Sequence, residues 1–306
     1  MRRERSVGHT PRRRRPPDQQ GSTMHIAIPD RQEKYMSGTN LPLTTSDGVI
    51  IRYDDEGEGR PVVLASGFTD QSPTWILQRD ALVKAGYRVI RFDHRLHGRS
   101  DTPAHGQRMS RLGLDLGELL TVLDLHDVVL VGHSMGVSVS LAYFSIAGDA
   151  WDRVTAFVAI DQSPKIVNDG EWQWGVRGIN DRNVYDAAHF RFEWFDNGIE
   201  PPEPEHVHRL LSSVTPTFTE FPMDKVQRLL IDHFVTDWRD VLPRIPVPTW
   251  VVTGRHSPFY DLAGMRWFAD TVQNGTLTVF EQSGHNPHLN EYQAFNSQLL
   301  DFIEQH

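Results

Sequence analysis

The 306-residue chain contains no cysteine. This absence excludes disulfide bonds, thiolate nucleophiles and metal sites built on cysteine. It is consistent with a reducing environment, and we expect a cytoplasmic protein. The chain also lacks any apolar stretch of the ~20 residues that a membrane-spanning helix requires, so no membrane association is expected.

Basic residues are concentrated near the N-terminus, although the whole chain carries a net charge of −9. Arg12–Arg15 form a run of four arginines. No apolar core follows this run, so the segment does not have the pattern of a secretory signal. Residues 1–40 lack apolar periodicity and are predicted to be a basic, disordered extension. The acidic remainder disfavours nucleic acid as a partner. If the arginines did bind nucleic acid, deletion of residues 1–35 would abolish that binding.

A short apolar run leads into a Gly-x-Ser-x-Gly sequence in the middle of the chain. Val128–Val131 are all apolar, which predicts a strand buried on both faces of a parallel sheet. Residues 137–146 are apolar or small without Gly or Pro, which predicts a buried helix. Ser134 then lies on a tight strand-to-helix turn. Gly132 and Gly136 leave room for the strained serine backbone, because they have no side chains.

Strands and helices alternate along most of the sequence. Strands are predicted over residues 61–65, 87–93, 128–131, 153–161, 248–254 and 276–281, preceded by a hairpin that turns at residues 46–48. Helices are predicted over residues 75–85, 109–125, 137–146, 265–272 and 290–304. This alternation predicts the α/β class, with an open, doubly wound and mostly parallel sheet. Ligands bind such sheets at the carboxyl ends of the strands.

The alternation stops after the strand that ends near Asp161. Residues 162–237 are too long for a plain loop and are rich in aromatic residues. We predict that they form a helical cap over the carboxyl edge of the sheet, and that residues 41–161 and 238–306 form the core. Most of the aromatic side chains are expected to pack the cap on the core, and a few to line a substrate pocket. The predicted pocket residues are Trp172, Trp174, Phe192 and Trp194.

Several motifs together resemble those of the α/β-hydrolase superfamily, over about residues 41–304. They are Ser66-Gly67-Phe68, Asp93 to Ser100, Gly132 to Gly136, and Ser283-Gly284-His285. Within the superfamily, the chain is most similar to small esterases and to the cofactor-free haloperoxidase and perhydrolase group. The resemblance implies an α/β-hydrolase fold and a serine nucleophile, with no metal or other cofactor.

The resemblance implies that Ser134 is the nucleophile and His285 its base. His285 follows the last predicted strand, where the family places its histidine. The third member departs from the family pattern. Most relatives carry Asp in a Gly-x-x-Asp sequence after the penultimate strand, and Ser257 stands at that position here. Asp161, at the end of the strand after the nucleophile helix, is the predicted acid, and Asp261 is the alternative.

The backbone N–H groups of Phe68 and Met135 are expected to form the oxyanion hole. These residues predict a serine hydrolase that cleaves an apolar, small-molecule ester or lactone through an acyl-enzyme. A monomer or homodimer is expected. Perhydrolase or haloperoxidase-like activity, and hydrolysis of thioesters or carbon–carbon bonds, remain alternatives on the same residues. Another alternative is a ligand sensor without turnover, which the serine at position 257 supports.

Overall fold

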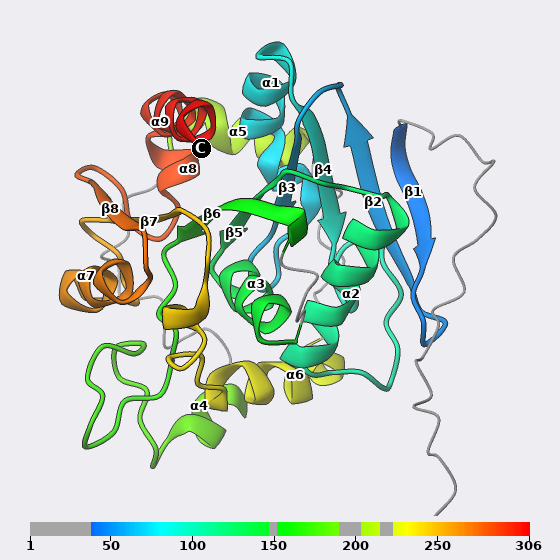
Figure 1. The fold of residues 1–306 in the computed structure, drawn as a ribbon. Coiled ribbons are helices and arrows are strands. Elements are labelled where there is room, and N and C mark those ends of the chain that lie inside the picture. The colour runs from blue at the N-terminus through cyan, green and yellow to red at the C-terminus, as the bar shows by residue number, and fades with distance from the viewer. Residues whose placement is uncertain (1–37, 147–151, 190–202, 215–222) are drawn as a thin grey trace, which may run out of the picture. The chain divides into compact units, whose positions relative to one another are not determined.

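The computed structural model describes residues 38–146, 152–189, 203–214 and 223–306. Within these ranges, eight strands form one sheet in the order β1-β2-β4-β3-β5-β6-β7-β8 (Figure 1). The strands are β1 (Gly38–Thr44), β2 (Ile50–Glu56), β3 (Pro61–Ala65), β4 (Arg88–Asp93), β5 (Val128–His133), β6 (Val154–Ile160), β7 (Thr249–Gly254) and β8 (Gly275–Phe280). Pairing is antiparallel from β1 to β4 through β2 and parallel elsewhere. The predicted doubly wound, mostly parallel α/β sheet is therefore confirmed.

The first strand corrects one predicted boundary. β1 begins at Gly38, inside the predicted extension of residues 1–40. Gly38 is paired with Asp55 of β2, and Asn40 donates its backbone N–H to Asp54 at 2.7 Å. The rest of the predicted extension lies outside the described residues.

Helices cover both faces of the sheet. On one face lie α1 (Ile76–Lys84) and α9 (Tyr292–Gln305), and on the other α2 (Met109–Val122), α3 (Met135–Ile146) and α7 (Leu262–Thr271). In β5, Val128 and Leu130 join the core on one face, while Val129 and Val131 join the core on the other. This double burial explains why the strand is a continuous apolar run. Of the helices in the described ranges, none is long and apolar enough to cross a membrane.

The strand order brings several strand ends together at one edge. The last residue of β3, Ala65, is paired with Gly132 of β5, and His133 of β5 is paired with Ile160 of β6. The chain therefore leaves these three strands side by side. β3 also lies between β4 and β5, so the winding of the sheet reverses there. Such a reversal is where parallel α/β sheets bind their ligands.

Between β6 and β7, the described residues include three α-helices: α4 (Val184–His189), α5 (Glu205–Val214) and α6 (Met223–Val235). The predicted cap is helical only in part, because residues 162–183 form no α-helix. The Asn168 side chain ties these loops together by donating to the carbonyls of Val176 and Ile179, both at 2.8 Å. An asparagine used in this way favours turns over helix.

The helix α6 is joined to the core through α2. The backbone N–H of Met109, the first residue of α2, donates to Asp232 of α6 at 2.7 Å.

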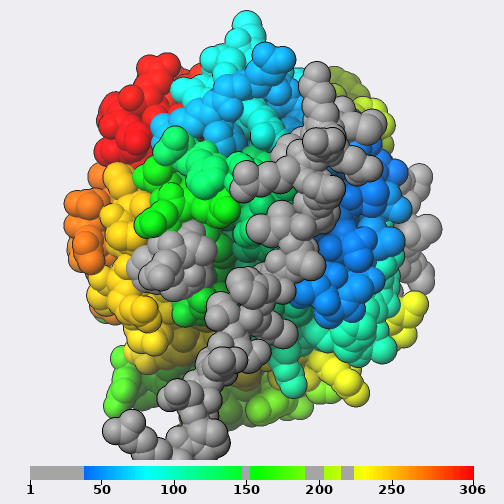
Figure 2. All heavy atoms as spheres, turned by 45° about the vertical axis from the view of Figure 1, so that its right-hand side comes forward, coloured from blue at the N-terminus to red at the C-terminus, as the bar shows by residue number. Residues whose placement is uncertain are grey.

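Figure 2 shows the early strands (blue) and the last helix (red) at opposite sides of one face, in agreement with the sheet order.

Candidate active site

Ser134 occupies the turn between β5 and α3. Its φ of +51° lies in the left-handed region, which non-glycine residues rarely adopt. The turn is held by a 2.9 Å hydrogen bond from its backbone N–H to the carbonyl of Ile160. A Cβ on Gly132 would lie 2.7 Å from the Gly136 backbone, and a Cβ on Gly136 would lie 2.1 Å from the carbonyl oxygen of Ala65. The two glycines are therefore required for the close packing predicted around this serine.

His285 follows β8 and is paired with Asp161. The histidine Nδ1 lies 2.6 Å from a carboxylate oxygen of Asp161, which is fully buried directly after β6. A carboxylate only accepts hydrogen bonds, so Nδ1 carries the proton and Nε2 is left as the basic nitrogen. The alternative acid, Asp261, is instead 2.5 Å from Arg177, with its side chain 54% exposed. Of the two candidate acids, the structure brings Asp161 to the histidine.

Two hydroxyl groups also hold the Asp161 carboxylate. Thr253 of β7 donates to one oxygen at 2.5 Å, and Ser257 donates to the other at 2.8 Å. Ser257 stands where the resemblance to the α/β-hydrolase superfamily implies an acid, and here its hydroxyl binds a carboxylate that follows the neighbouring strand, β6. Hydrogen bonds of this kind stabilise a buried charged carboxylate. The hydrogen bond between Ser257 and Asp161 was not predicted from the sequence. The unexpected serine at position 257 was the feature that could have indicated it.

The loop after β3 packs directly against Ser134. A Cβ on Gly67 would lie 3.3 Å from the Ser134 Cβ, which shows how close the two segments are. Phe68 lines the same cavity as Ser134, and Met135 is the first residue of α3. The residues expected to form the oxyanion hole thus lie next to the serine, and that role stays a prediction. Ser66 is turned to Trp75, whose indole N–H donates to its hydroxyl at 3.0 Å.

A cavity of about 140 Å³ lies over Ser134 and His285. Its described lining residues are Phe68, Ser134, Gln162, Ile166, Val176, Leu230, His233, Phe234, Phe259, Tyr260 and His285. The members from α6 (Leu230, His233, Phe234) place this helix over the carboxyl ends of the strands. Their i, i+3, i+4 spacing was a signal in the sequence that the prediction missed.

The predicted pocket aromatics are not in this wall. Trp172 and Trp174 pack on Trp267 of α7, with ring centroids 4.8 and 6.2 Å from it. Neither is among the described residues that line the cavity, so a pocket role for these two residues stays a prediction. An aromatic ring can be buried equally well against a neighbouring helix. The other two, Phe192 and Trp194, lie outside the described residues.

Burial keeps two histidines near the site neutral. Desolvation lowers the pKa of His233 to about 3, and it lowers the pKa of His288 well below its usual range. His133, directly before the serine, donates from Nε2 to the carbonyl of His285 at 3.0 Å and so holds the loop that carries it. Among the described residues, no group of three or more His, Asp or Glu side chains is arranged to hold a metal ion.

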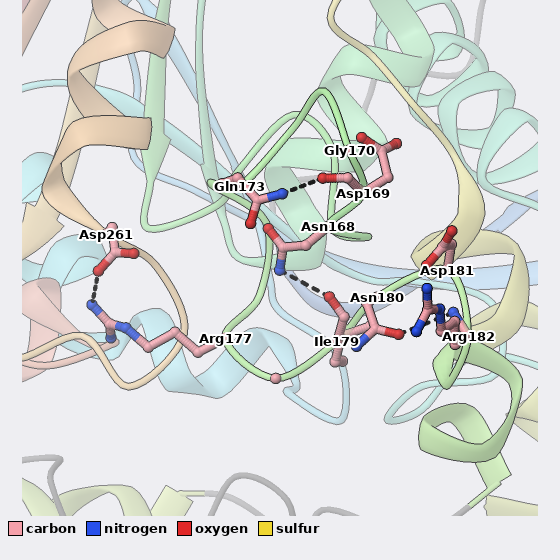
Figure 3. A pocket seen from close by; sticks show the side chains of 11 residues that line it. Asn168, Asp169, Gly170, Gln173, Arg177, Ile179, Asn180, Asp181, Arg182 and Asp261 are labelled. Carbon is pink, nitrogen blue, oxygen red and sulfur yellow. Dashed lines mark hydrogen bonds and ion pairs between the residues drawn. The ribbon is translucent and has the colours of Figure 1, made fainter.

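A larger hollow of about 580 Å³ lies apart from these residues (Figure 3). It is lined mainly by the loops before α4, together with Asp261. Figure 3 shows Asp261 engaged with Arg177 and Asn168 engaged with the backbone of Ile179. These polar groups bind one another, and neither Ser134 nor His285 lies in this wall.

A family model described as "Alpha/beta hydrolase family" matches residues 62–298. The non-heme chloroperoxidase CPO-A1 of Kitasatospora aureofaciens is 30% identical, over 85% of this chain and 98% of that protein. The 3-oxoadipate enol-lactonase 2 of Acinetobacter baylyi is 26% identical, over 82% of this chain and 92% of that protein. An esterase structure from Exiguobacterium antarcticum is 24% identical, with a TM-score of 0.75, covering 88% of this chain and 100% of the esterase.

Proposed function

The chain belongs to the alpha/beta hydrolase family, and from this premise we propose that it is a serine hydrolase that cleaves a carboxylic ester or lactone. One observation carries the proposal: Ser134 and His285 line one cavity, and His285 is hydrogen-bonded to a buried carboxylate. The enol-lactonase among the relatives supports the choice of an ester-type bond.

In this mechanism His285 Nε2 takes the proton of the Ser134 hydroxyl while the serine oxygen attacks the substrate carbonyl. Asp161 stabilises the imidazolium that forms. The N–H groups of Phe68 and Met135 stabilise the negative oxygen of the tetrahedral intermediate. The intermediate collapses to an acyl-enzyme, and the alcohol leaves with the proton from His285. Water, deprotonated by the same histidine, then releases the acid and restores the serine.

The test is hydrolysis of short-chain p-nitrophenyl esters, with a fluorophosphonate probe alongside. Ser134→Ala is expected to lose both turnover and labelling, because the nucleophile is absent. Asp161→Asn is expected to lower kcat by roughly 10³- to 10⁴-fold, since the buried amide no longer stabilises the imidazolium. Asp261→Asn is the matched control and is expected to keep its activity. A wild-type protein that neither labels nor hydrolyses any ester would overturn the proposal.

A second candidate is perhydrolysis, which the chloroperoxidase among the relatives favours. Hydrogen peroxide would replace water at the acyl-enzyme, so that its oxygen forms the new bond to the acyl carbon and a peracid leaves. The test is peracid formation from an ester and peroxide, compared between wild type and Ser134→Ala. Peracid that persists in the alanine variant would exclude the acyl-enzyme route.

A further inference from the structure

Two polar side chains in the cavity wall are buried without a full set of partners. Gln162 is 1% exposed and His233 is 5% exposed. Gln162 Oε1 and His233 Nδ1 have no hydrogen-bond partner among the described residues. Both side chains line the cavity that contains Ser134 and His285. Buried polar groups are nearly always hydrogen-bonded, so an orphaned pair beside a candidate nucleophile calls for a ligand.

The orientation of the Gln162 amide is fixed by its other end. Its Nε2 donates to the carbonyl oxygen of Ser163 at 3.0 Å, and the side chain is also hydrogen-bonded with Tyr260. A flipped amide would place two acceptors against each other at Ser163, so Oε1 is the end that has no partner among the described residues. Gln162 directly follows Asp161, and its position is set by the same strand, β6, that positions the candidate acid. The site therefore offers one hydrogen-bond acceptor at a fixed place.

His233 adds a group that both donates and accepts. Burial keeps its ring neutral, and a neutral imidazole carries one N–H and one bare nitrogen. It reaches the cavity from α6, between Leu230 and Phe234.

The rest of the wall is mostly apolar. Six of the other described lining residues have apolar side chains: Phe68, Ile166, Val176, Leu230, Phe234 and Phe259. A purely apolar substrate would leave the side chains of Gln162 and His233 without hydrogen-bond partners. A substrate with a polar group could pair with these two side chains, while its apolar part packs against the rest of the wall. A hydroxyl group suits both, because it donates to the amide oxygen and accepts from the imidazole N–H.

We propose that Gln162 and His233 bind a hydroxyl group of the substrate, so that the site selects hydroxy-substituted esters or lactones. This inference deepens the proposed function and rests on it. A site that hydrogen-bonds a substrate hydroxyl rejects the analogue that lacks it, because its own buried groups are then left unpaired. Gln162 and His233 are specificity-determining residues in this scheme.

The test compares kcat/KM for p-nitrophenyl 3-hydroxybutyrate with kcat/KM for p-nitrophenyl butyrate. Wild type is expected to favour the hydroxy ester by at least about tenfold. Gln162→Met keeps the length of the side chain without its acceptor and is expected to lower this ratio by about tenfold. His233→Leu is expected to lower it in the same direction. Gln298→Met, at an exposed position on α9, is the matched control and should keep the wild-type ratio.

A binding assay separates this inference from the proposed function. The unreactive Ser134→Ala variant is titrated with methyl 3-hydroxybutyrate and methyl butyrate. Tighter binding of the hydroxy ester, lost in Ser134→Ala/Gln162→Met, supports the inference whether or not wild type turns over. Equal binding of the two esters, or a ratio that Gln162→Met does not change, overturns it while leaving ester hydrolysis intact.

Discussion

At the scale of single residues, the unusual feature is that the candidate acid is in contact with Ser257, the position at which the resemblance to the α/β-hydrolase superfamily implies an acid. Ser257 Oγ lies 2.8 Å from the same Asp161 oxygen that His285 contacts at 2.6 Å. A carboxylate at position 257 would therefore be close to the histidine. A carboxylate that faces His285 could therefore be carried either after β6, at position 161, or after β7, at position 257.

We predict that Ser257→Asp partly rescues Asp161→Asn. The double variant is expected to recover at least about tenfold of the kcat lost in Asp161→Asn, because a carboxylate again faces the imidazole. The measurement is kcat on a p-nitrophenyl ester for both variants. Ser257→Asn in the same background is the control, since it adds similar bulk without charge. A double variant that folds but remains as slow as Asp161→Asn would show that position 257 does not reach His285.

At the scale of elements, the site depends on how closely α2 and α3 pack, because α3 begins next to Ser134. Gly113 of α2 allows this approach: a Cβ there would lie 2.7 Å from both the Ala142 Cβ and the Tyr143 backbone nitrogen. One turn later, a Cβ on Gly117 would meet the Tyr143 ring at 3.4 Å, an ordinary contact distance.

We predict that Gly113→Ala lowers the free energy of unfolding by about 1–3 kcal/mol, because the added methyl group overpacks the interface between the helices. Gly117→Ala, in the same helix, is expected to be neutral or to stabilise by up to about 1 kcal/mol through helix propensity. Urea unfolding measures both. Equal destabilisation by the two substitutions would contradict the close approach at Gly113.

The elements were largely predictable from local sequence patterns, such as the short apolar run of β5 and the repeated leucines on one face of α2. The turn at Ser134 was predictable for the same reason, because its glycines lie within two residues of it. The pairing of His285 with Asp161 spans 124 positions and depends on the strand order, which fixes which strand ends meet. Which aromatic rings line the cavity was not predictable, because aromatic character alone does not tell whether a ring lines the cavity, as Phe259 does, or packs on Trp267 of α7, as Trp172 does.

At the scale of the whole molecule, buried histidines couple stability to pH. The described core contains four histidines whose pKa is lowered by burial. The pKa of His94 and of His233 is lowered to about 3, and the pKa of His97 and of His288 also lies below its usual value. Their pKa in the unfolded chain is about 6.5. The unfolded chain therefore takes up protons first as the pH falls, and the stability that is fully present above about pH 6.5 is lost progressively below it.

We predict that the free energy of unfolding is nearly constant from pH 7.5 to about pH 6.5 and falls steadily from there to pH 4.5, measured by urea unfolding at each pH. His233→Leu is expected to reduce the slope, because it removes one of the titrating groups. His208→Gln, at an exposed position on α5, is the control and should keep the wild-type slope. A stability that is constant over this range would refute the prediction.

Placing the acid on β6 also changes what the loop after β7 is free to do. That loop supplies a serine hydroxyl to Asp161 and two aromatic side chains, Phe259 and Tyr260, to the cavity wall. If the acid were carried by this loop, at position 257, a change in the loop would put the acid itself at risk. In this chain, mutation can reshape the wall at Phe259 and Tyr260 while the charged partner of His285 stays on a different strand. The candidate acid and this part of the cavity wall thus lie on separate segments, and an evolving lineage or a directed-evolution library can vary the wall at Phe259 and Tyr260 while Asp161 is conserved.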